Sequence, residues 1–188
     1  LDLEFSLHAV YIYSMQSPLK GRGTTWAILH RYAAHERAAF DDGWGTLDQQ
    51  ADEVEAPPAT EIIEEHARSV LTANDSPDIA FDLSINPYRG CEHGCIYCFA
   101  RPTHSYLNLS PGLDFETRIV AKVNVAERLR TALAAQRYRP SLLNVGSATD
   151  AYQPIERKLR LTRSVIEVLA EASHAFSLVT KSSGVERD

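Results

Sequence analysis

The stretch Cys91-Glu92-His93-Gly94-Cys95-Ile96-Tyr97-Cys98 contains all three cysteines of the 188-residue chain, in the spacing C-x3-C-x2-C. Cysteines scattered by chance would not gather in one short loop, so we expect these three to bind one metal centre together. Thiolates are soft ligands that select iron–sulfur clusters, zinc or copper(I). The pair at x2 spacing can hold one metal through a tight turn, and the third cysteine suits a larger object such as a cubane cluster.

A four-iron cluster normally takes four cysteine thiolates, and this chain offers three. One iron would therefore lack a protein thiolate and be open to a small molecule. Gly90 and Gly94 allow the backbone to approach a cluster closely, and Tyr97 offers a flat apolar face beside the metal. The stretch therefore predicts a cluster with one open iron.

This spacing, with the aromatic residue Tyr97 before the last cysteine, resembles the cluster motif of the radical S-adenosylmethionine (SAM) superfamily. The wider segment reads SINPYRG before the first cysteine and FARP after the last. It resembles the branch that contains spore photoproduct lyase and the DNA repair photolyase-like proteins. The resemblance runs from about Lys20 to the end of the chain and is strongest from Asp75 to Lys181.

The resemblance implies that Cys91, Cys95 and Cys98 hold a [4Fe–4S] cluster and that SAM chelates the open iron through its amino and carboxylate groups. Reduction by a donor such as flavodoxin or ferredoxin then cleaves SAM to a 5′-deoxyadenosyl radical, in a lyase-type or related reaction. A nucleic-acid lesion is the substrate that the branch suggests, by an analogy of fold alone. No catalytic residue is assigned, because in the family later strands shape the substrate pocket and supply any hydrogen donor.

Two other metal-binding roles stay open on the residues themselves. A structural Cys3His zinc site would take His93 or His104 as its fourth ligand. An electron-transfer iron–sulfur module is the other, although the fourth thiolate that it would use is missing. Iron, sulfide and zinc content separate these roles from a SAM-cleaving enzyme.

Composition restricts the class of protein. The net charge of −6 and the pI of about 5.6 argue against a broad, non-specific nucleic-acid surface, although a local basic groove is compatible with them. The clustered, odd-numbered cysteines do not suggest a disulfide framework, so a reducing cytoplasm fits best. The apolar run from Phe5 to Tyr13 is too short to span a membrane and lacks the pattern of a secretory signal.

We expect an irregular N-terminal extension and linker over residues 1–59, and the N-terminal part of a radical SAM core over residues 60–188. Within the extension, Lys20-Gly21-Arg22-Gly23 is a small basic turn, similar to the Gly-Arg-Gly that the family often carries near its start. The stretch from Trp26 to Phe40 has helical character, and the acidic run that ends in Pro57-Pro58 is typical of a surface linker.

Hydrophobic periodicity predicts alternating helices and strands in residues 60–188. Thr60 can cap a helix to Leu71, and Asn124, with Glu127 in a capping box, can start a helix to about Gln136. A third helix starts at Thr162. The predicted strands and extended segments are Ile79–Ile85, Arg118–Val123, Ser141–Gly146 and Ala175–Thr180.

This alternation is typical of an α/β fold with a parallel sheet and crossover helices. The resemblance implies an incomplete (β/α)6 partial TIM barrel, of which the pattern supplies about three parallel strands. We therefore expect the chain to be the first part of a longer protein, with the Ala175–Thr180 strand at an edge of the sheet. In such folds active sites are built from the loops that follow the strands, so we expect the loops of the cysteines, Asp150 and Lys181 to share one face.

SAM offers an amino acid end, a ribose and an adenine, and the residues in these loops suit each part. Lys181, with Ser182 beside it, suits the carboxylate, and the resemblance also places a SAM-contacting lysine there. Asp150 and Glu156 can accept hydrogen bonds from the ribose and the amino group, with Ser147 and Thr149 as hydroxyl partners. Tyr97 and Tyr152 offer aromatic faces for the adenine or the cluster.

Each of these assignments has a structural alternative. Asp150 could cap a turn, and Glu156, followed by Arg157 and Lys158, could belong to a solvated charge cluster. Lys181 could be a surface lysine, but its place at the end of a strand favours the site.

Overall fold

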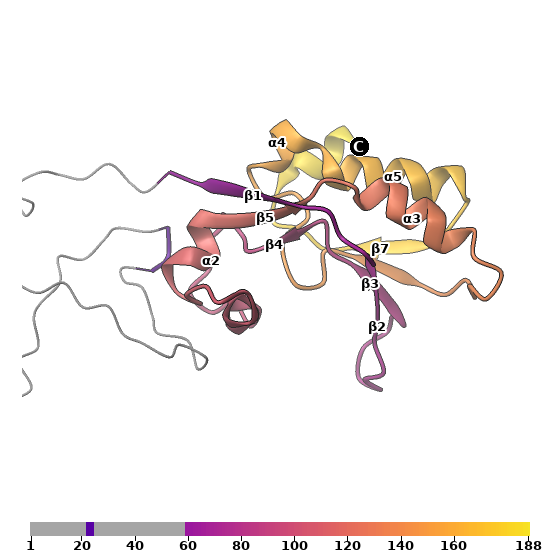
Figure 1. The fold of residues 1–188 in the computed structure, drawn as a ribbon, viewed down its shortest axis with the longest axis horizontal. Helices are drawn as coiled ribbons and strands as arrows, with labels where there is room; N and C mark the ends of the chain where they lie inside the picture. The colour runs from indigo at the N-terminus through magenta and orange to yellow at the C-terminus, as the bar shows by residue number, and fades with distance from the viewer. Residues whose placement is uncertain (1–21, 25–58) are drawn as a thin grey trace, which may run out of the picture.

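The computed structural model describes residues 22–24 and 59–188 (Figure 1). The predicted helix over Trp26–Phe40 and the linker through Pro58 lie outside the described residues. The described chain forms a mixed α/β structure with one four-stranded and one three-stranded sheet. The α/β class is therefore confirmed, and both sheets contain parallel and antiparallel pairs.

The four-stranded sheet has the order β2-β3-β6-β7. It consists of β2 (Leu71–Ala73), β3 (Leu83–Ile85), β6 (Leu143–Val145) and β7 (Phe176–Leu178). The last three strands are parallel and correspond to the three predicted strands, each shorter than the pattern suggested, whereas β2 is antiparallel to β3. Among the described strands β7 pairs only with β6, so it lies at an edge, as predicted.

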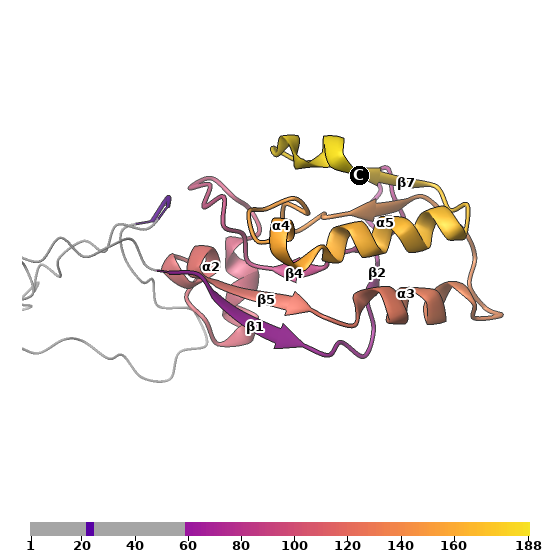
Figure 2. The ribbon, with the colours of Figure 1, turned by 90° about the horizontal axis from the view of Figure 1, so that it is seen from above.

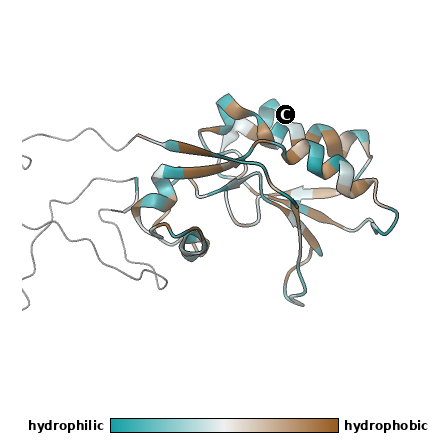
Figure 3. Cartoon of the chain, viewed as in Figure 1, coloured by the Kyte–Doolittle hydropathy of each residue, from teal (hydrophilic) through white to brown (hydrophobic). Residues whose placement is uncertain are grey.

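Two helices lie side by side over this sheet, α3 (Val125–Leu133) and α5 (Leu161–Glu171) (Figures 1 and 2). Both mix hydrophobic and hydrophilic residues around their circumference (Figure 3), as expected of helices with one face on a core. Fully buried apolar residues of the helices and strands form one cluster, which includes Ile85, Val125, Leu129, Leu143, Val145, Val165 and Leu169. Burial of these side chains is the main stabilising term for this part of the fold.

The capping prediction for α3 is only partly confirmed. The helix begins after Asn124, but the Asn124 side chain makes no capping hydrogen bond. It instead accepts a hydrogen bond from the backbone N–H of Ala67 at 2.9 Å and donates one to the Ala67 carbonyl at 3.0 Å. Asn124 therefore fixes a distant loop rather than its own helix, which no local pattern could indicate.

The three-stranded sheet has the order β1-β5-β4, formed by β1 (Glu61–Glu65), β5 (Arg118–Lys122) and β4 (Tyr88–Arg89). The extended segment predicted from Arg118 is confirmed as β5, but the helix predicted from Thr60 to Leu71 is wrong. Its first half is β1, in parallel register with β5. Adjacent isoleucines favour a strand, and β5 supplies a backbone ladder together with a 2.8 Å ion pair between Arg118 and Glu61.

Short elements complete the described chain: η1 (Arg101–Leu107), α2 (Leu113–Thr117), α4 (Glu156–Leu159) and η2 (Ser183–Arg187). The elements η1 and α2 follow the cysteines directly in the chain. In the part of the chain that the structure describes, no helix combines the length and the apolar character needed to cross a membrane.

Candidate metal centre

The Cys loop (Cys91–Cys98) follows β4. Two glycines adopt the left-handed region here, Gly90 just before the loop at φ 82° and Gly94 within it at φ 61°. A Cβ on Gly90 would stand 2.8 Å from Cε1 of His104 and 2.9 Å from the carbonyl oxygen of Phe115, so no other residue fits without displacing its neighbours. The Cys91 N–H donates to the Phe115 carbonyl at 2.8 Å, which anchors the start of the loop on α2.

One cavity of about 510 Å³ brings the Cys loop together with two other loops. These are the β6 loop (residues 146–152) and the β7 loop (residues 179–182), which follow the ends of parallel strands. The predicted site residues that line the cavity are Cys91, Cys95, Cys98, Ser147, Thr149, Asp150 and Lys181. The expected common face is therefore present, and the cavity is of a size typical for small-molecule sites.

Lys181 lies directly against the Cys loop. Its ammonium Nζ is 2.8 Å from Sγ of Cys95 and 2.7 Å from the hydroxyl of Tyr97, and it is 4.9 Å from the centroid of the Tyr97 ring. The hydrogen bonds to Cys95 and then Tyr97 raise the pKa of Lys181, so it is charged at neutral pH. Although Tyr97 is 77% exposed and does not line the cavity, it positions the lysine there.

Asp150 joins all three loops around the cavity. Its Oδ1 accepts hydrogen bonds from the hydroxyl of Thr180 at 2.6 Å and the N–H of Tyr152 at 2.8 Å. Its Oδ2 accepts the N–H of Lys181 at 2.8 Å and lies 3.4 Å from Nε2 of His93. Both oxygens are therefore engaged within the protein, and Asp150 holds the loops together in addition to lining the cavity.

The three thiols differ in environment. Cys91 is buried, whereas Cys95 and Cys98 are partly exposed. Burial is the main cause that raises the pKa of Cys91 to about 11, and it outweighs hydrogen bonds from the backbone of His93 and Asp150, which lower the pKa. The Cys91 thiol is therefore hard to ionise in the protein alone. Metal binding requires the thiolate, and a bound cation would favour that form.

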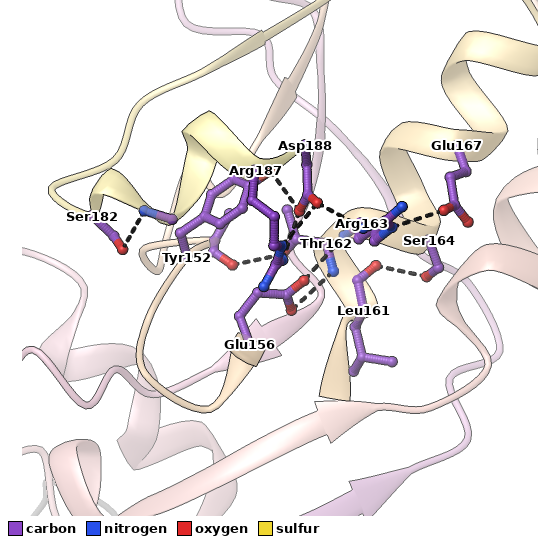
Figure 4. A network of polar contacts seen from close by, with 12 residues as sticks. Tyr152, Glu156, Leu161, Thr162, Arg163, Ser164, Glu167, Ser182, Arg187 and Asp188 are labelled. Carbon is purple, nitrogen blue, oxygen red and sulfur yellow. Dashed lines mark hydrogen bonds and ion pairs between the residues drawn. The ribbon is translucent and has the colours of Figure 1, made fainter. Parts of the chain in front are cut away.

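Besides Tyr97, three predicted SAM contacts do not line the cavity: Tyr152, Glu156 and Ser182. The buried carboxylate of Glu156 accepts hydrogen bonds from the hydroxyl of Tyr88 and from the N–H groups of Thr162 and Arg163, at 3.1 and 3.0 Å for the latter two. It therefore caps the start of α5, where the helix dipole favours a negative charge (Figure 4). The solvated charge cluster considered for Glu156 is not seen either, since the side chain is buried.

Tyr152 and Ser182 make structural contacts in the same part of the fold as Glu156 (Figure 4). Tyr152 packs in the core, and its hydroxyl donates to Asp188 at 3.3 Å. Burial, followed by the charge of Asp188, raises the pKa of Tyr152 to about 12. The Ser182 hydroxyl accepts the N–H of Gly184 at 3.1 Å and caps η2.

The two candidate zinc-binding histidines lie in different places. His93 lines the cavity, and its Nε2 is buried without a hydrogen-bond partner. His104 is fully buried away from the cavity, where its Nε2 lies 3.0 Å from the Arg118 carbonyl. Across residues 22–24 and 59–188, no three His, Cys, Asp or Glu side chains converge on a single-ion position.

Sequence reasoning missed the residues that hold the Cys loop from behind. Glu92 is 7% exposed, and its Oε2 accepts the N–H of Ile155 at 2.5 Å. The Gln153 side chain accepts the N–H of Glu92 at 2.9 Å and donates to the Gly90 carbonyl at 3.2 Å. No local pattern indicated these contacts, because a carboxylate in a loop is normally solvated and needs partners within the protein only when it is buried.

Arg101 and Glu116 support the other side of the loop. The Arg101 guanidinium donates to the carbonyls of Cys95 at 2.9 Å and Gly94 at 2.8 Å, and to the Glu116 carboxylate at 2.8 Å. Glu116 is fully buried. Burial alone would raise the pKa of Glu116, but hydrogen bonds from Thr24, Arg101 and Gly23 outweigh it and lower the pKa below its usual value.

No family model matches the chain, and no solved structure matches it significantly. Uncharacterised proteins of Mycobacterium bovis and Mycobacterium tuberculosis are 43% identical to it over 110 residues, which is 58% of this chain and 32% of theirs. An uncharacterised protein of Methanocaldococcus jannaschii is 28% identical over 128 residues, which is 68% of this chain and 45% of that protein. The chain thus spans between about a third and a half of the length of these relatives.

Proposed function

We propose that the chain is part of a radical SAM enzyme, in which Cys91, Cys95 and Cys98 hold a [4Fe–4S] cluster and SAM binds in the adjoining cavity. The observation that carries the proposal is that all three thiols and the Lys181 ammonium line one cavity of about 510 Å³. The donor set fits the cluster, because three thiolates leave one iron for a small molecule. The number and spacing of the cysteines agree with this arrangement.

When bound, the reduced cluster supplies the electron that cleaves SAM to a 5′-deoxyadenosyl radical. The protein's own residues bind and orient the SAM molecule. Lys181 offers a cation for the carboxylate, and its position 2.8 Å from Cys95 also offsets the negative charge of the thiolates. Ser147 and Thr149 also line the cavity, although their hydroxyls already have partners in Asn86 and the Tyr88 carbonyl.

Reconstitution of the intact chain under anaerobic conditions tests the proposal. We expect about four irons and four sulfides per chain, a brown colour, and a change in the cluster spectrum when SAM is added. Each of the variants Cys91→Ala, Cys95→Ala and Cys98→Ala should fail to assemble a normal cluster. A normal cluster in any one of them would remove that cysteine from the ligand set.

His93 supports a second candidate function, a zinc-binding module with structural duty. His93 lines the same cavity as the thiols, and its buried Nε2 makes no hydrogen bond, although the Asp150 carboxylate lies 3.4 Å away; Cys3His is a common zinc ligand set. The same sample separates the two functions, because a colourless protein with one zinc per chain would support the module. If the protein is a zinc module, His93→Ala should lose the zinc. If it is a radical SAM enzyme, His93→Ala should keep its iron.

The remaining parts of the proposal rest on the resemblance. We propose that the two sheets belong to an incomplete (β/α)6 barrel, which further residues of a longer protein complete at the β7 edge. The reductant is a flavodoxin or ferredoxin, and the compartment is the cytoplasm. A nucleic-acid lesion is the substrate class to test first, by adding damaged DNA to the reconstituted protein and measuring 5′-deoxyadenosine formation.

A further inference from the structure

Residues 22–24, which we call the N-terminal strap (Arg22-Gly23-Thr24), lie beside α2 although they are far from it in sequence (Figure 1). The Gly23 N–H donates to Oε2 of Glu116 at 2.7 Å, across 93 positions of the chain. The Thr24 hydroxyl donates to Oε1 of the same carboxylate, and the Arg22 guanidinium donates to the Glu116 backbone carbonyl. The strap therefore supplies donors to a fully buried carboxylate.

The strap also binds the second buried carboxylate behind the Cys loop. Nη2 of Arg22 donates to the Thr60 hydroxyl at 2.6 Å and lies 3.5 Å from Oε1 of Glu92. The Thr60 hydroxyl donates in turn to that same oxygen at 2.8 Å. Glu92 follows Cys91 directly, so this contact holds the residue next to the first of the three thiols.

Gly23 and Gly94 pack against each other with no space for a side chain on either. A Cβ on Gly23 would stand 1.8 Å from the carbonyl oxygen of Gly94 and 3.2 Å from Cγ2 of Ile96. A Cβ on Gly94 would stand 2.7 Å from Cβ of Arg22. The Gly94 carbonyl cannot move aside freely, because Arg101 donates to it at 2.8 Å. Any side chain at Gly23 must therefore displace the strap.

We propose that the N-terminal strap is a positioning element that clamps the Cys loop against α2 and so holds the three thiols in place for the cluster. This deepens the proposed function and rests on it only for the identity of the cluster. The strap contacts the loop at Gly94 and Ile96 and reaches Glu92 and Glu116 behind it. It touches neither the cavity nor any thiol, so its effect on the metal is through the loop.

Alkylation of the cluster-free, reduced chain with iodoacetamide measures the clamp without metal or activity. Cys91 is buried, so it reacts only when the loop opens, whereas Cys95 and Cys98 are already partly exposed. We expect Gly23→Ala to alkylate Cys91 about tenfold faster, the factor that corresponds to about 1.4 kcal/mol. The rates at Cys95 and Cys98, followed by peptide mass spectrometry, should change much less.

Arg22→Ala is a second test of the clamp, and Arg130→Ala is its matched control. Arg130 also pairs with a carboxylate, that of Glu171 at 3.1 Å, but on the exposed faces of α3 and α5. We expect Arg22→Ala to speed alkylation of Cys91 and Arg130→Ala to leave it unchanged. If Gly23→Ala fails to fold, Thr24→Val carries the test, since it removes the donor to Glu116 with little change in volume.

The outcomes separate the clamp from the cluster. Reconstituted Gly23→Ala should lose iron to a chelator faster than the unaltered chain, whereas Arg130→Ala should lose it at the unaltered rate. If Cys91 is alkylated at the same rate with and without Gly23→Ala, the clamp is excluded, whatever metal the chain binds. If Gly23→Ala raises the alkylation rate of Cys91 but the unaltered chain takes up no iron, the result supports the clamp and contradicts the proposed function.

Discussion

The two sides of the cavity are built differently. On the thiol side, the Cys loop is backed by Glu92 and Glu116, which are 7% and 0% exposed and fully engaged in hydrogen bonds. On the lysine side, the β7 loop follows an edge strand, and none of its residues 179–182 is buried. Asp150 is the residue that ties this loop to the other two.

The difference matches what each side is proposed to do. Ligands of a metal cluster must be held in a fixed arrangement, and buried, fully bonded supporting groups provide this. A loop that contacts a small molecule can adjust to it, and such loops are drawn from the less stable parts of a fold. We therefore infer a rigid half for the cluster and an adaptable half for SAM, and the following predictions test that contrast.

The largest effect is expected at Glu116. Glu116→Ala leaves the Arg101 guanidinium, whose side chain is 11% exposed, without its carboxylate partner, and breaking a buried ion pair costs about 3–5 kcal/mol. Urea unfolding measures the loss. Glu171→Ala, which breaks the exposed pair with Arg130, should cost about 0–1 kcal/mol. Equal losses in the two variants would contradict a rigid thiol side.

Lys181→Ala should affect SAM binding rather than folding. The side chain is exposed, so the urea midpoint should stay the same, whereas loss of a charge-assisted hydrogen bond should weaken SAM binding by about 1.5–3 kcal/mol. Titration of the reconstituted intact chain with SAM measures this, with the exposed Lys158→Ala as control. Unchanged affinity would exclude Lys181 from the site.

Asp150→Ala should loosen the lysine side alone. It removes the acceptor for the Thr180 hydroxyl and the Lys181 N–H, a loss of about 1–3 kcal/mol. Hydrogen exchange at the Lys181 amide should become faster, while exchange at the Cys91 amide, bonded to Phe115, should not change. The exposed Asp78→Ala should alter neither amide. Faster exchange at both would show that the two sides open together.

The smallest effect is a dependence of the thiol side on pH. Burial lowers the pKa of His104 from its usual value, so the folded chain binds a proton on this ring less readily than the unfolded chain. The unfolded chain then binds more protons below about pH 6.5, and stability should fall as the pH drops, by no more than about 1.4 kcal/mol per pH unit for one group. His104→Gln should flatten this dependence between pH 6.5 and 5, relative to the exposed His66→Gln. An unchanged slope would show that His104 titrates normally.

The sequence by itself determined the parts of the molecule whose signals are local. The alternating strands β3, β6 and β7 and the amphipathic helices α3 and α5 follow from hydrophobic periodicity, and the structure confirms them. The spacing of the cysteines placed the candidate centre in one loop. Parallel strand order then placed the loops that carry Asp150 and Lys181 beside that loop, since parallel strands end at one edge.

Only the tertiary structure decided the parts that depend on distant partners. The segment EIIEE was predicted as part of a helix, and its pairing with β5, 57 positions away, makes it a strand. Glu156 and Asn124 have side chains that fit local roles, but burial gave them partners elsewhere. The two carboxylates behind the Cys loop and the strap that binds them come from segments far apart in the sequence, and the energy of a buried charge depends on what surrounds it in space.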